Sequence, residues 1–228
     1  MLSSRVMCGR YTLTTEGQKV AEAFELLDVP MVATGYNIAP TQQVAVVRAQ
    51  ADDSRALSHI SWGLVPFRDW QTRGRPLINA RSETVAEKPL FKWSFRRRRC
   101  LVVADGWYEW KKVSDGRQPY RFVRPDRGLF GMAGIWAEWT TDDGEVVESC
   151  AVLTTDANAV AAAVHHRMPV IIPPANYGTW LRSSLRDPAA LQPLLVPGSA
   201  DDLTVYPVSR MVNNARNQGS ACIESVTL

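Results

Sequence analysis

The stretch Cys100–Val123, CLVVADGWYEWKKVSDGRQPYRFV, decides the fold class. It begins with an apolar run, Cys100–Ala104, which is typical of a buried strand. Trp107–Lys112 and Tyr120–Val123 follow, separated by the turn residues Ser114-Asp115-Gly116, and this pattern predicts a β-hairpin. A buried strand that leads directly into a hairpin indicates a mostly antiparallel sheet.

More strands and a few short helices are expected on both sides of this stretch. The predicted strands are Val44–Arg48, His59–Leu64, Leu129–Thr140, Val146–Thr154 and Val170–Ile172, and the predicted helices are Thr14–Leu27, Asn158–Val164 and Asn176–Arg182. Thr15 is expected to cap the first helix, and Pro188–Pro197 is expected to be a surface loop. Strands in meander order with few helices predict a single α+β domain.

Composition limits the class of protein. The 228 residues have a net charge of +3 and are 46% hydrophobic, as in one ordinary globular domain. No apolar run approaches the roughly 18 residues of a membrane span, and the N-terminus lacks a signal peptide, so a cytoplasmic protein is expected. The four cysteines form no CxxC pair, which argues against a disulfide framework or a zinc site, and Cys100 and Cys150 are expected to be inert core residues.

Basic residues are concentrated in two places. Arg96–Arg99 form one run, and Arg73, Arg75 and Arg81 lie shortly before it. Such a run is ordinarily a solvated surface, and contact with nucleic acid is the sharper interpretation.

Cys8 in Met7-Cys8-Gly9-Arg10 is the first candidate for chemistry. If translation starts at Met7 and that methionine is removed, Cys8 carries a free amine beside its thiol. The amine forms a Schiff base with an aldehyde, and the sulfur then closes a thiazolidine ring. An α-amine has a pKa of about 7.7–8.0 and is partly neutral near pH 7. The alternative is a buried, unreactive cysteine in a first strand.

Glu109 lies in Asp105-Gly106-Trp107-Tyr108-Glu109-Trp110. Because side chains alternate along a strand, Glu109 shares a face with Trp107. An indole neighbour desolvates the carboxyl and raises its pKa toward that of a useful general acid. An exposed strand glutamate is the alternative.

Three further polar residues are candidates. His165, in His165-His166-Arg167-Met168-Pro169, can exchange protons near neutral pH, and Arg167 suits phosphate. Asn79, in Ile78-Asn79-Ala80-Arg81-Ser82-Glu83-Thr84, has an amide that can orient an amine or a sugar hydroxyl. A structural histidine and a turn asparagine are the alternatives. The aromatic residues Trp62, Phe67 and Trp70 stack on bases if they are exposed.

Together and in this order, these motifs resemble the SRAP (SOS response-associated peptidase) family from Met7 to about Gln218. The other matching segments are Tyr36-Asn37-Ile38-Ala39-Pro40-Thr41, Trp62-Gly63-Leu64-Val65-Pro66 and Pro207-Val208-Ser209-Arg210. The resemblance implies an α+β domain with a β-barrel-like core and a basic groove. It also implies a monomer without metal or cofactor that binds single-stranded DNA and traps abasic sites as a thiazolidine crosslink.

The resemblance also implies roles for individual residues. Cys8 is the nucleophile, Asn79 positions the amine and the opened sugar, Glu109 transfers protons, and His165 assists ring opening, reversal or a lyase side reaction. The implied DNA contacts are Arg10, Asn37, Pro40, Trp62, Phe67, Arg81, Thr154, Arg167 and Ser209. Such a protein acts in the SOS response and associates with the nucleoid when it is bound to damaged DNA.

The sequence departs from the family pattern at its start, where residues 1–6 precede Met7-Cys8. An internal Cys8 has an amide nitrogen, which cannot form a Schiff base. We therefore expect residues 1–6 to be a non-native or cleaved leader and residues 7–228 to be the domain. A start at Met7 is the favoured explanation, and self-cleavage is the other. After Pro66, the sequence Phe67-Arg68-Asp69 also departs from the aromatic pattern that is common in the family.

Two other functions use some of the same residues. A cysteine peptidase or amidohydrolase requires His165 within hydrogen-bond reach of the Cys8 sulfur, with Asn79 in an oxyanion hole. A non-catalytic binder of single-stranded DNA uses only the arginines and aromatic residues.

Overall fold

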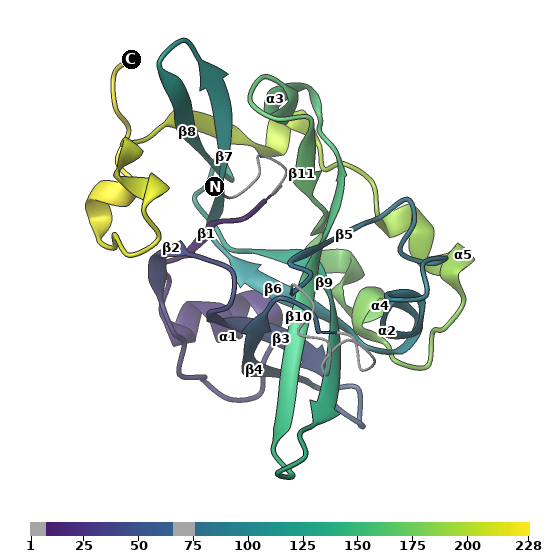
Figure 1. Cartoon of the computed structure of the whole chain (residues 1–228). Coiled ribbons are helices and arrows are strands. Elements are labelled where there is room, and N and C mark those ends of the chain that lie inside the picture. Colours follow the sequence, from purple (N-terminus) through teal and green to yellow (C-terminus); the bar gives the residue numbers. More distant parts are fainter. Residues whose placement is uncertain (1–7, 66–75) are drawn as a thin grey trace.

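The apolar run and the hairpin that follows it belong to two different sheets. In the computed structural model, which describes residues 8–65 and 76–228, the run forms β6 (Arg99–Ala104). The hairpin forms β7 (Gly106–Val113) and β8 (Gly116–Val123), paired from Trp107 opposite Phe122 to Val113 opposite Gly116. The chain therefore changes sheet at Asp105, between β6 and β7 (Figure 1).

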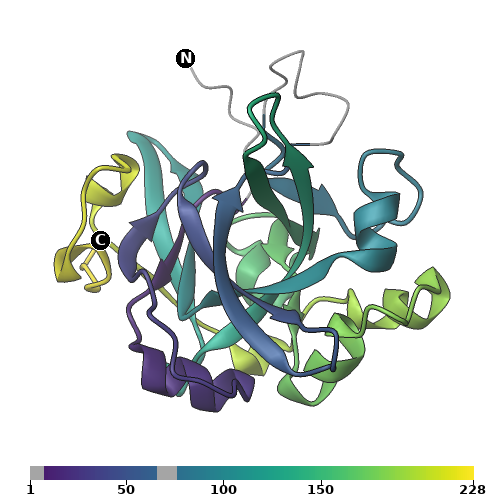
Figure 2. The same ribbon diagram turned by 90° about the horizontal axis from the view of Figure 1, so that it is seen from below.

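The first sheet is a closed barrel of five strands. Its strands are β3 (Gln43–Ala49), β4 (Arg55–Trp62), β6, β9 (Phe130–Thr140) and β10 (Val146–Asp156). They pair in the order β10-β4-β3-β6-β9, and β9 pairs with β10 to close the ring. The pair β4–β10 is parallel, and the other pairs in the ring are antiparallel. Figure 2 shows the barrel from below.

The second sheet packs beside the barrel and is antiparallel throughout. Its order is β13 (Thr204–Pro207), β8, β7, β1 (Tyr11–Leu13) and β2 (Gly35–Ile38). Apolar side chains of both sheets form one buried cluster that includes Tyr11, Trp62 and Trp107. This shared core fixes the position of β1 and β7 against the barrel.

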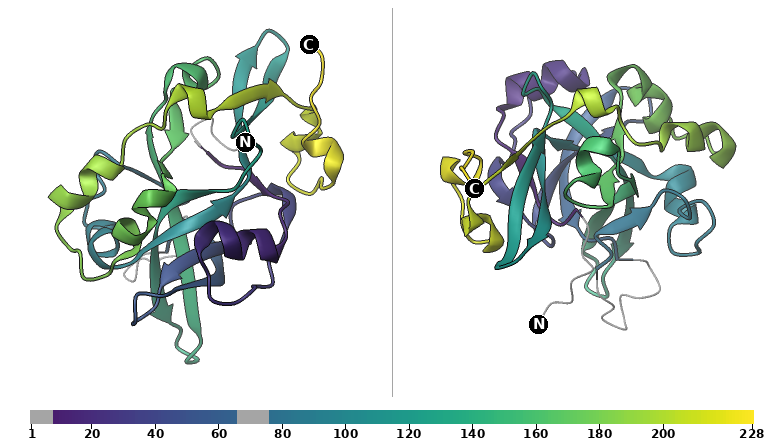
Figure 3. Two further views of the ribbon diagram at one scale, coloured as in Figure 1. Left: turned by 180° about the vertical axis from the view of Figure 1, so that it is seen from behind. Right: turned by 90° about the horizontal axis from the view of Figure 1, so that it is seen from above.

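Short strands and helices complete the domain at its periphery (Figure 3). β5 (Asn79–Arg81) and β11 (Arg167–Pro169) pair with β10, and β12 (Ile171–Ile172) pairs with β9. The helices are α1 (Gly17–Phe24), α2 (Lys92–Arg97), α3 (Ala159–Ala162), α4 (Tyr177–Leu181) and α5 (Pro188–Leu191). Short 3₁₀ turns occupy Pro174–Asn176, Gln192–Leu194, Ala200–Asp202, Arg210–Asn213 and Ser220–Cys222. Within the two described ranges, no helix has the length and apolar character needed to cross a bilayer.

The predicted α+β class with its antiparallel, barrel-like core is confirmed. The prediction that Thr15 caps the first helix is wrong. α1 begins at Gly17, and its N-cap residue Glu16 makes no side-chain capping bond, while the Thr15 hydroxyl bonds to Asp105 at 3.4 Å. The predicted loop Pro188–Pro197 is also partly wrong, because Asp187 accepts a hydrogen bond from Ala189 N and starts α5 there.

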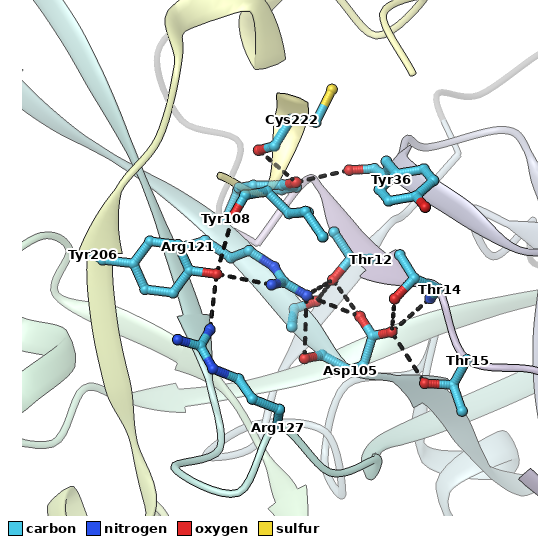
Figure 4. A network of polar contacts seen from close by, with 12 residues as sticks. Thr12, Thr14, Thr15, Tyr36, Asp105, Tyr108, Arg121, Arg127, Tyr206 and Cys222 are labelled. Carbon is cyan, nitrogen blue, oxygen red and sulfur yellow. Dashed lines mark hydrogen bonds and ion pairs between the residues drawn. The ribbon is translucent and has the colours of Figure 1, made fainter. Parts of the chain in front are cut away.

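A buried polar network around Asp105 holds the second sheet together (Figure 4). Its carboxylate accepts hydrogen bonds from Thr12 Oγ1 at 2.5 Å and from the Thr14 hydroxyl at 2.7 Å, and it lies 3.1 Å from Arg121 Nη2. Arg121 also donates to the hydroxyl of Tyr206 on β13. The network therefore ties β1, β8 and β13 to the point where the chain enters β7.

Candidate functional site

The register between β1 and β7 brings Cys8 to Glu109. Tyr11 lies opposite Trp107, and Tyr108 N donates to Arg10 O at 3.0 Å, so the chain before β1 runs on along β7. Cys8 N donates to Glu109 Oε1 at 2.8 Å. Both side chains are buried, at 4% exposure for Cys8 and 3% for Glu109. The candidate nucleophile and the candidate proton carrier, 101 residues apart in the sequence, are thus in direct contact.

Burial controls the titration of both groups. It raises the pKa of Glu109 from 4.5 to about 7, although hydrogen bonds from the Cys8 thiol and amide act in the opposite direction. Burial, followed by the charge and hydrogen bond of Glu109, raises the pKa of the Cys8 thiol well above its ordinary value. The expected desolvation of Glu109 is confirmed. Near neutral pH, Glu109 exchanges protons readily while the thiol stays protonated.

Arg167 is held by carboxylates beside this pair. Its Nη1 donates to Glu83 Oε1 at 2.6 Å and to Asp156 Oδ1 at 2.7 Å, and its Nη2 donates to Glu83 Oε2 at 2.9 Å and to the Thr154 carbonyl at 2.6 Å. Its side chain is only 6% exposed. The charge of Arg167 lowers the pKa of the Cys8 thiol, against the larger effect of burial, so the guanidinium lies within electrostatic reach of the sulfur.

His165 lies in the turn between α3 and β11. The side chain of Asn158 caps α3 by accepting from Ala161 N at 2.9 Å, and the chain turns at His165 and His166 into Arg167. His165 Nδ1 lies 3.1 Å from Arg167 N, from which it can accept a hydrogen bond, and 3.2 Å from the Arg167 carbonyl oxygen, to which it can donate one. Burial lowers the pKa of His165, a hydrogen bond with the backbone of Arg167 acts in the opposite direction, and the charges of His166, Arg117 and Arg167 lower the pKa further. The net effect lowers the pKa of the imidazole below its ordinary value and so favours the neutral ring.

Asn79 and Arg81 lie on one face of β5. This strand runs parallel to β10, with Asn79 opposite Val152 and Arg81 opposite Thr154. Because strand residues alternate, Ala80 points to the other face and is buried at 2% exposure. Asn79 is half-buried and Arg81 is exposed, so Arg81 is available to a ligand at the surface.

The C-terminal segment supplies contacts that the sequence analysis missed. Arg10 Nη1 donates to Asn37 Oδ1 and to the Val212 carbonyl, each at 2.8 Å, and Trp110 Nε1 donates to Asn213 Oδ1 at 2.6 Å. Glu83 and Asp156, which hold Arg167, were missed as well. Glu83 lies within a segment that matched the family pattern, so its acidic character beside Arg81 was the available signal. No local pattern marked Val212 or Asn213.

The remaining predicted DNA contacts lie in different environments. Trp62 is 1% exposed, packs edge-on against Tyr11 and donates its indole N–H to Ile78 O at 2.9 Å. A base cannot stack on this ring, so that prediction for Trp62 is wrong. Asn37 and Thr154 are fully buried, whereas Pro40 and Ser209 are half-buried. Phe67, Trp70, Arg73 and Arg75 lie outside the described residues.

The two cysteines that were expected to lie in the core are buried, and Cys222 is buried as well. Cys100 and Cys150 are 0% exposed, and burial raises the pKa of the Cys100 thiol to about 12. Across residues 8–65 and 76–228 there is no cluster of three or more histidine, cysteine or acidic side chains that could hold a metal. The chemistry that the contact between Cys8 and Glu109 offers is that of a thiol and a carboxyl within electrostatic reach of a guanidinium.

This arrangement of fold and site defines a barrel-containing α+β domain with a buried cysteine–glutamate pair. The family model for SOS response associated peptidase (SRAP) matches residues 7–215. The chain therefore belongs to the SRAP family. The abasic site processing protein YoqW of Bacillus subtilis is 36% identical, with 96% of this chain and all of that protein covered.

More distant relatives extend this similarity. The abasic site processing protein YedK of Escherichia coli is 31% identical over 96% of this chain and all of that protein. The abasic site processing protein HMCES of Xenopus tropicalis is 30% identical over 85% of this chain and 66% of that protein. A crystal structure of a Bacteroides thetaiotaomicron protein has the same fold, with a TM-score of 0.83 at 23% identity and 96% of this chain covered.

Proposed function

We propose that this protein is an abasic-site processing enzyme that binds single-stranded DNA and joins Cys8 covalently to the opened sugar of the lesion. The contact of 2.8 Å between the Cys8 nitrogen and Glu109 carries this proposal, since both atoms of the aminothiol then lie beside one proton carrier. The names of the relatives, which are abasic site processing proteins, support the choice of substrate.

The chemistry needs Cys8 as the first residue. Its neutral amine adds to the aldehyde carbon of the ring-opened sugar, and the resulting carbinolamine loses water to give an imine. The sulfur then bonds to the imine carbon while the thiol proton moves to the nitrogen, which closes the thiazolidine. A Glu109 carboxyl with a pKa of about 7 can protonate the departing hydroxyl and accept the thiol proton. His165 and Asn79 then have the roles of assisting ring opening and orienting the sugar.

The residues before Cys8 must be absent for this reaction. Translation from Met7 followed by removal of that methionine achieves this, as does cleavage of the Met7–Cys8 bond by the protein itself. Intact-mass measurement of the native protein distinguishes the processed species from the full chain. A protein that keeps residues 1–7 and still crosslinks an abasic oligonucleotide would refute the thiazolidine mechanism.

The pKa of the Cys8 thiol argues against a cysteine peptidase. Thiol peptidases use a thiolate whose pKa is lowered by a nearby histidine, whereas burial and Glu109 raise the pKa of the Cys8 thiol. The hydrogen bonds found for Cys8 in the described part of the chain go to Glu109 and not to His165. An amine that attacks first does not require a thiolate.

The test is a denaturing gel of the Met7-start protein with abasic and intact single-stranded oligonucleotides. We expect a covalent product with the abasic strand alone, and no product for Cys8→Ala. Cys8→Ala should keep salt-sensitive DNA binding, because phosphate contacts do not involve the thiol. Equal covalent product from Cys8→Ala would exclude Cys8 as the nucleophile.

A further inference from the structure

A continuous stack of arginine and tryptophan side chains lies on the outside of the barrel. The Arg48 guanidinium lies 4.4 Å from the centre of the Trp136 ring, and Arg98 lies 4.9 Å from the same ring. Arg98 also lies 4.5 Å from the centre of the Trp93 ring, so it stands between two indoles. We call the set Arg48, Trp136, Arg98, Trp93, Arg97 and Arg96 the arginine–tryptophan surface.

The arginines at the barrel end of this surface, Arg48 and Arg98, form ion pairs, whereas Arg96 and Arg97 at its α2 end do not form one with the described residues. Arg48 pairs with Glu148, and Arg98 Nη2 pairs with Glu138 Oε1 at 2.6 Å. Trp93 is 49% exposed. Arg96 and Arg97 are exposed, and neither forms an ion pair with any residue in the described ranges. The α2 end therefore presents a half-exposed aromatic ring, with the Arg97 guanidinium 5.9 Å from the ring centre, and two cations without an ion pair in the described ranges.

This surface is separate from the Cys8–Glu109 pair. Trp93, Arg96 and Arg97 belong to α2, which contacts β6 and β9 of the barrel. In Figures 1 and 2, α2 and the β7–β8 hairpin lie on opposite sides of the barrel. β5, which carries the exposed Arg81, lies between them in Figure 1. A DNA strand that reached both the candidate site and α2 would pass the side of the barrel that carries β5.

We propose that the arginine–tryptophan surface binds the single-stranded flank of the same DNA strand whose lesion occupies the Cys8 site, so the proposal rests on the proposed function. A single strand presents flat bases and phosphates in alternation, and the exposed Trp93 ring beside Arg96 and Arg97 matches both groups. An acidic protein bound at this surface would pair with the arginines but would make no use of the exposed Trp93 ring. A duplex keeps its bases stacked inside and would use only the charges.

The experiment measures anisotropy of fluorescent undamaged oligothymidylate of two lengths, about 4 and about 16 nucleotides, which bracket the footprint of single-strand binding domains. The variants are Trp93→Leu, which removes the ring, and Arg96→Gln/Arg97→Gln, which removes the charges. Matched controls are Met31→Ala, an apolar side chain that is 90% exposed, and Lys19→Gln, an exposed cation on α1. Thermal unfolding of each variant checks that it is folded.

We expect each α2 variant to bind the long strand at least about fivefold more weakly than its control, and the short strand equally well. The double variant should also reduce the slope of log affinity against log salt by about 1.4 on the long strand, at about 0.7 per lost phosphate contact. Trp93→Leu should leave that slope unchanged.

The proposal would be overturned if the α2 variants bound the long strand within twofold of their controls. It would also be overturned if their loss of affinity were equal on the short strand, or if they lost affinity for duplex DNA alone. Crosslinking of a short abasic strand at saturating concentration separates the two proposals, because both α2 variants should match the wild type there. If the wild type forms no crosslink but the length-dependent loss persists, the thiazolidine proposal fails and the flank surface stands.

Discussion

Replacing Glu109 by glutamine should make the protein more stable at alkaline pH. The folded protein raises the pKa of this carboxyl from 4.5 to about 7, and burial is the main cause. The folded state therefore binds the proton more tightly than the unfolded state, so the free energy of unfolding falls as the pH rises from 4.5 to about 7. Above pH 7 the wild type carries the full cost of a buried carboxylate.

The size of the effect follows from about 1.4 kcal/mol per pKa unit. The wild type should lose about 1 kcal/mol by pH 5 and about 3 kcal/mol by pH 8, relative to acidic pH. Glu109→Gln is neutral at every pH and keeps an oxygen that can accept the Cys8 N–H bond. The free energy of unfolding of the variant, relative to that of the wild type, should therefore rise by about 2 kcal/mol between pH 5 and pH 8.

Urea unfolding of the wild type and Glu109→Gln at pH 5 and pH 8 measures this difference. Glu87→Gln, an exposed change, is the control and should alter stability by no more than about 0.5 kcal/mol at either pH. If the difference between Glu109→Gln and the wild type is the same at both pH values, Glu109 does not titrate as described. The proton-transfer role would then lose its physical basis.

Three other substitutions test the placement of residues. Arg99→Ala should lower the free energy of unfolding by about 3–5 kcal/mol, because the buried guanidinium donates to the carbonyls of Phe95, Trp180, Arg182 and Leu185. The control is Arg97→Ala at an exposed position, which should change the free energy of unfolding by no more than about 0.5 kcal/mol. Equal effects of the two substitutions in urea unfolding would contradict the burial of Arg99. Trp62→Ala should lower the free energy of unfolding by about 3–5 kcal/mol and lower the melting temperature, since it opens a cavity in the core. A variant with an unchanged melting temperature and weaker DNA binding would instead support stacking of a base on Trp62. Arg81→Ala should weaken DNA binding for every sequence and reduce the salt slope by about 0.7, and a loss confined to one base context would indicate base reading.

Long periodic segments were predictable from the sequence, and short ones were not. The β7–β8 hairpin and the β9–β10 pair have long runs of apolar and aromatic residues separated by turn residues, and both were found as expected. β1, β2, β5 and β13 have three or four residues each, which is too short for a period to be visible. Their conformation depends on the partner strand rather than on local preference.

The candidate site shows the same division between local and long-range information. The burial of Glu109 could be predicted, because its place beside Trp107 in an aromatic strand is a local feature, although the Trp107 ring stacks on Phe122. Trp62 could not be placed, since the same motif fits a core ring and an exposed one. The basic run Arg96–Arg99 divides in a way that no local pattern indicates, with Arg99 buried at 3% exposure and Arg96 and Arg97 in solvent. Burial changes at Arg99 because α2 ends at Arg97 and the buried strand β6 begins at Arg99.

The geometry at Cys8 depends on where the chain passes from the barrel to the second sheet. The barrel positions Asn79 and Arg167 on strands that pair with β10, whereas Glu109 lies on β7 of the second sheet and Cys8 lies just before β1 of that sheet. Asp105, at 4% exposure, is the residue between β6 and β7, and its bonds to Thr12, Thr14 and Arg121 tie the start of the second sheet to the end of β6. A buried carboxylate with this many donors has few alternative arrangements, because any shift of β1 leaves a charged group without partners. The Asp105 network thus limits how far β1 and β7 can move relative to β6, and through them it limits the movement of the contact between Cys8 and Glu109 relative to the barrel.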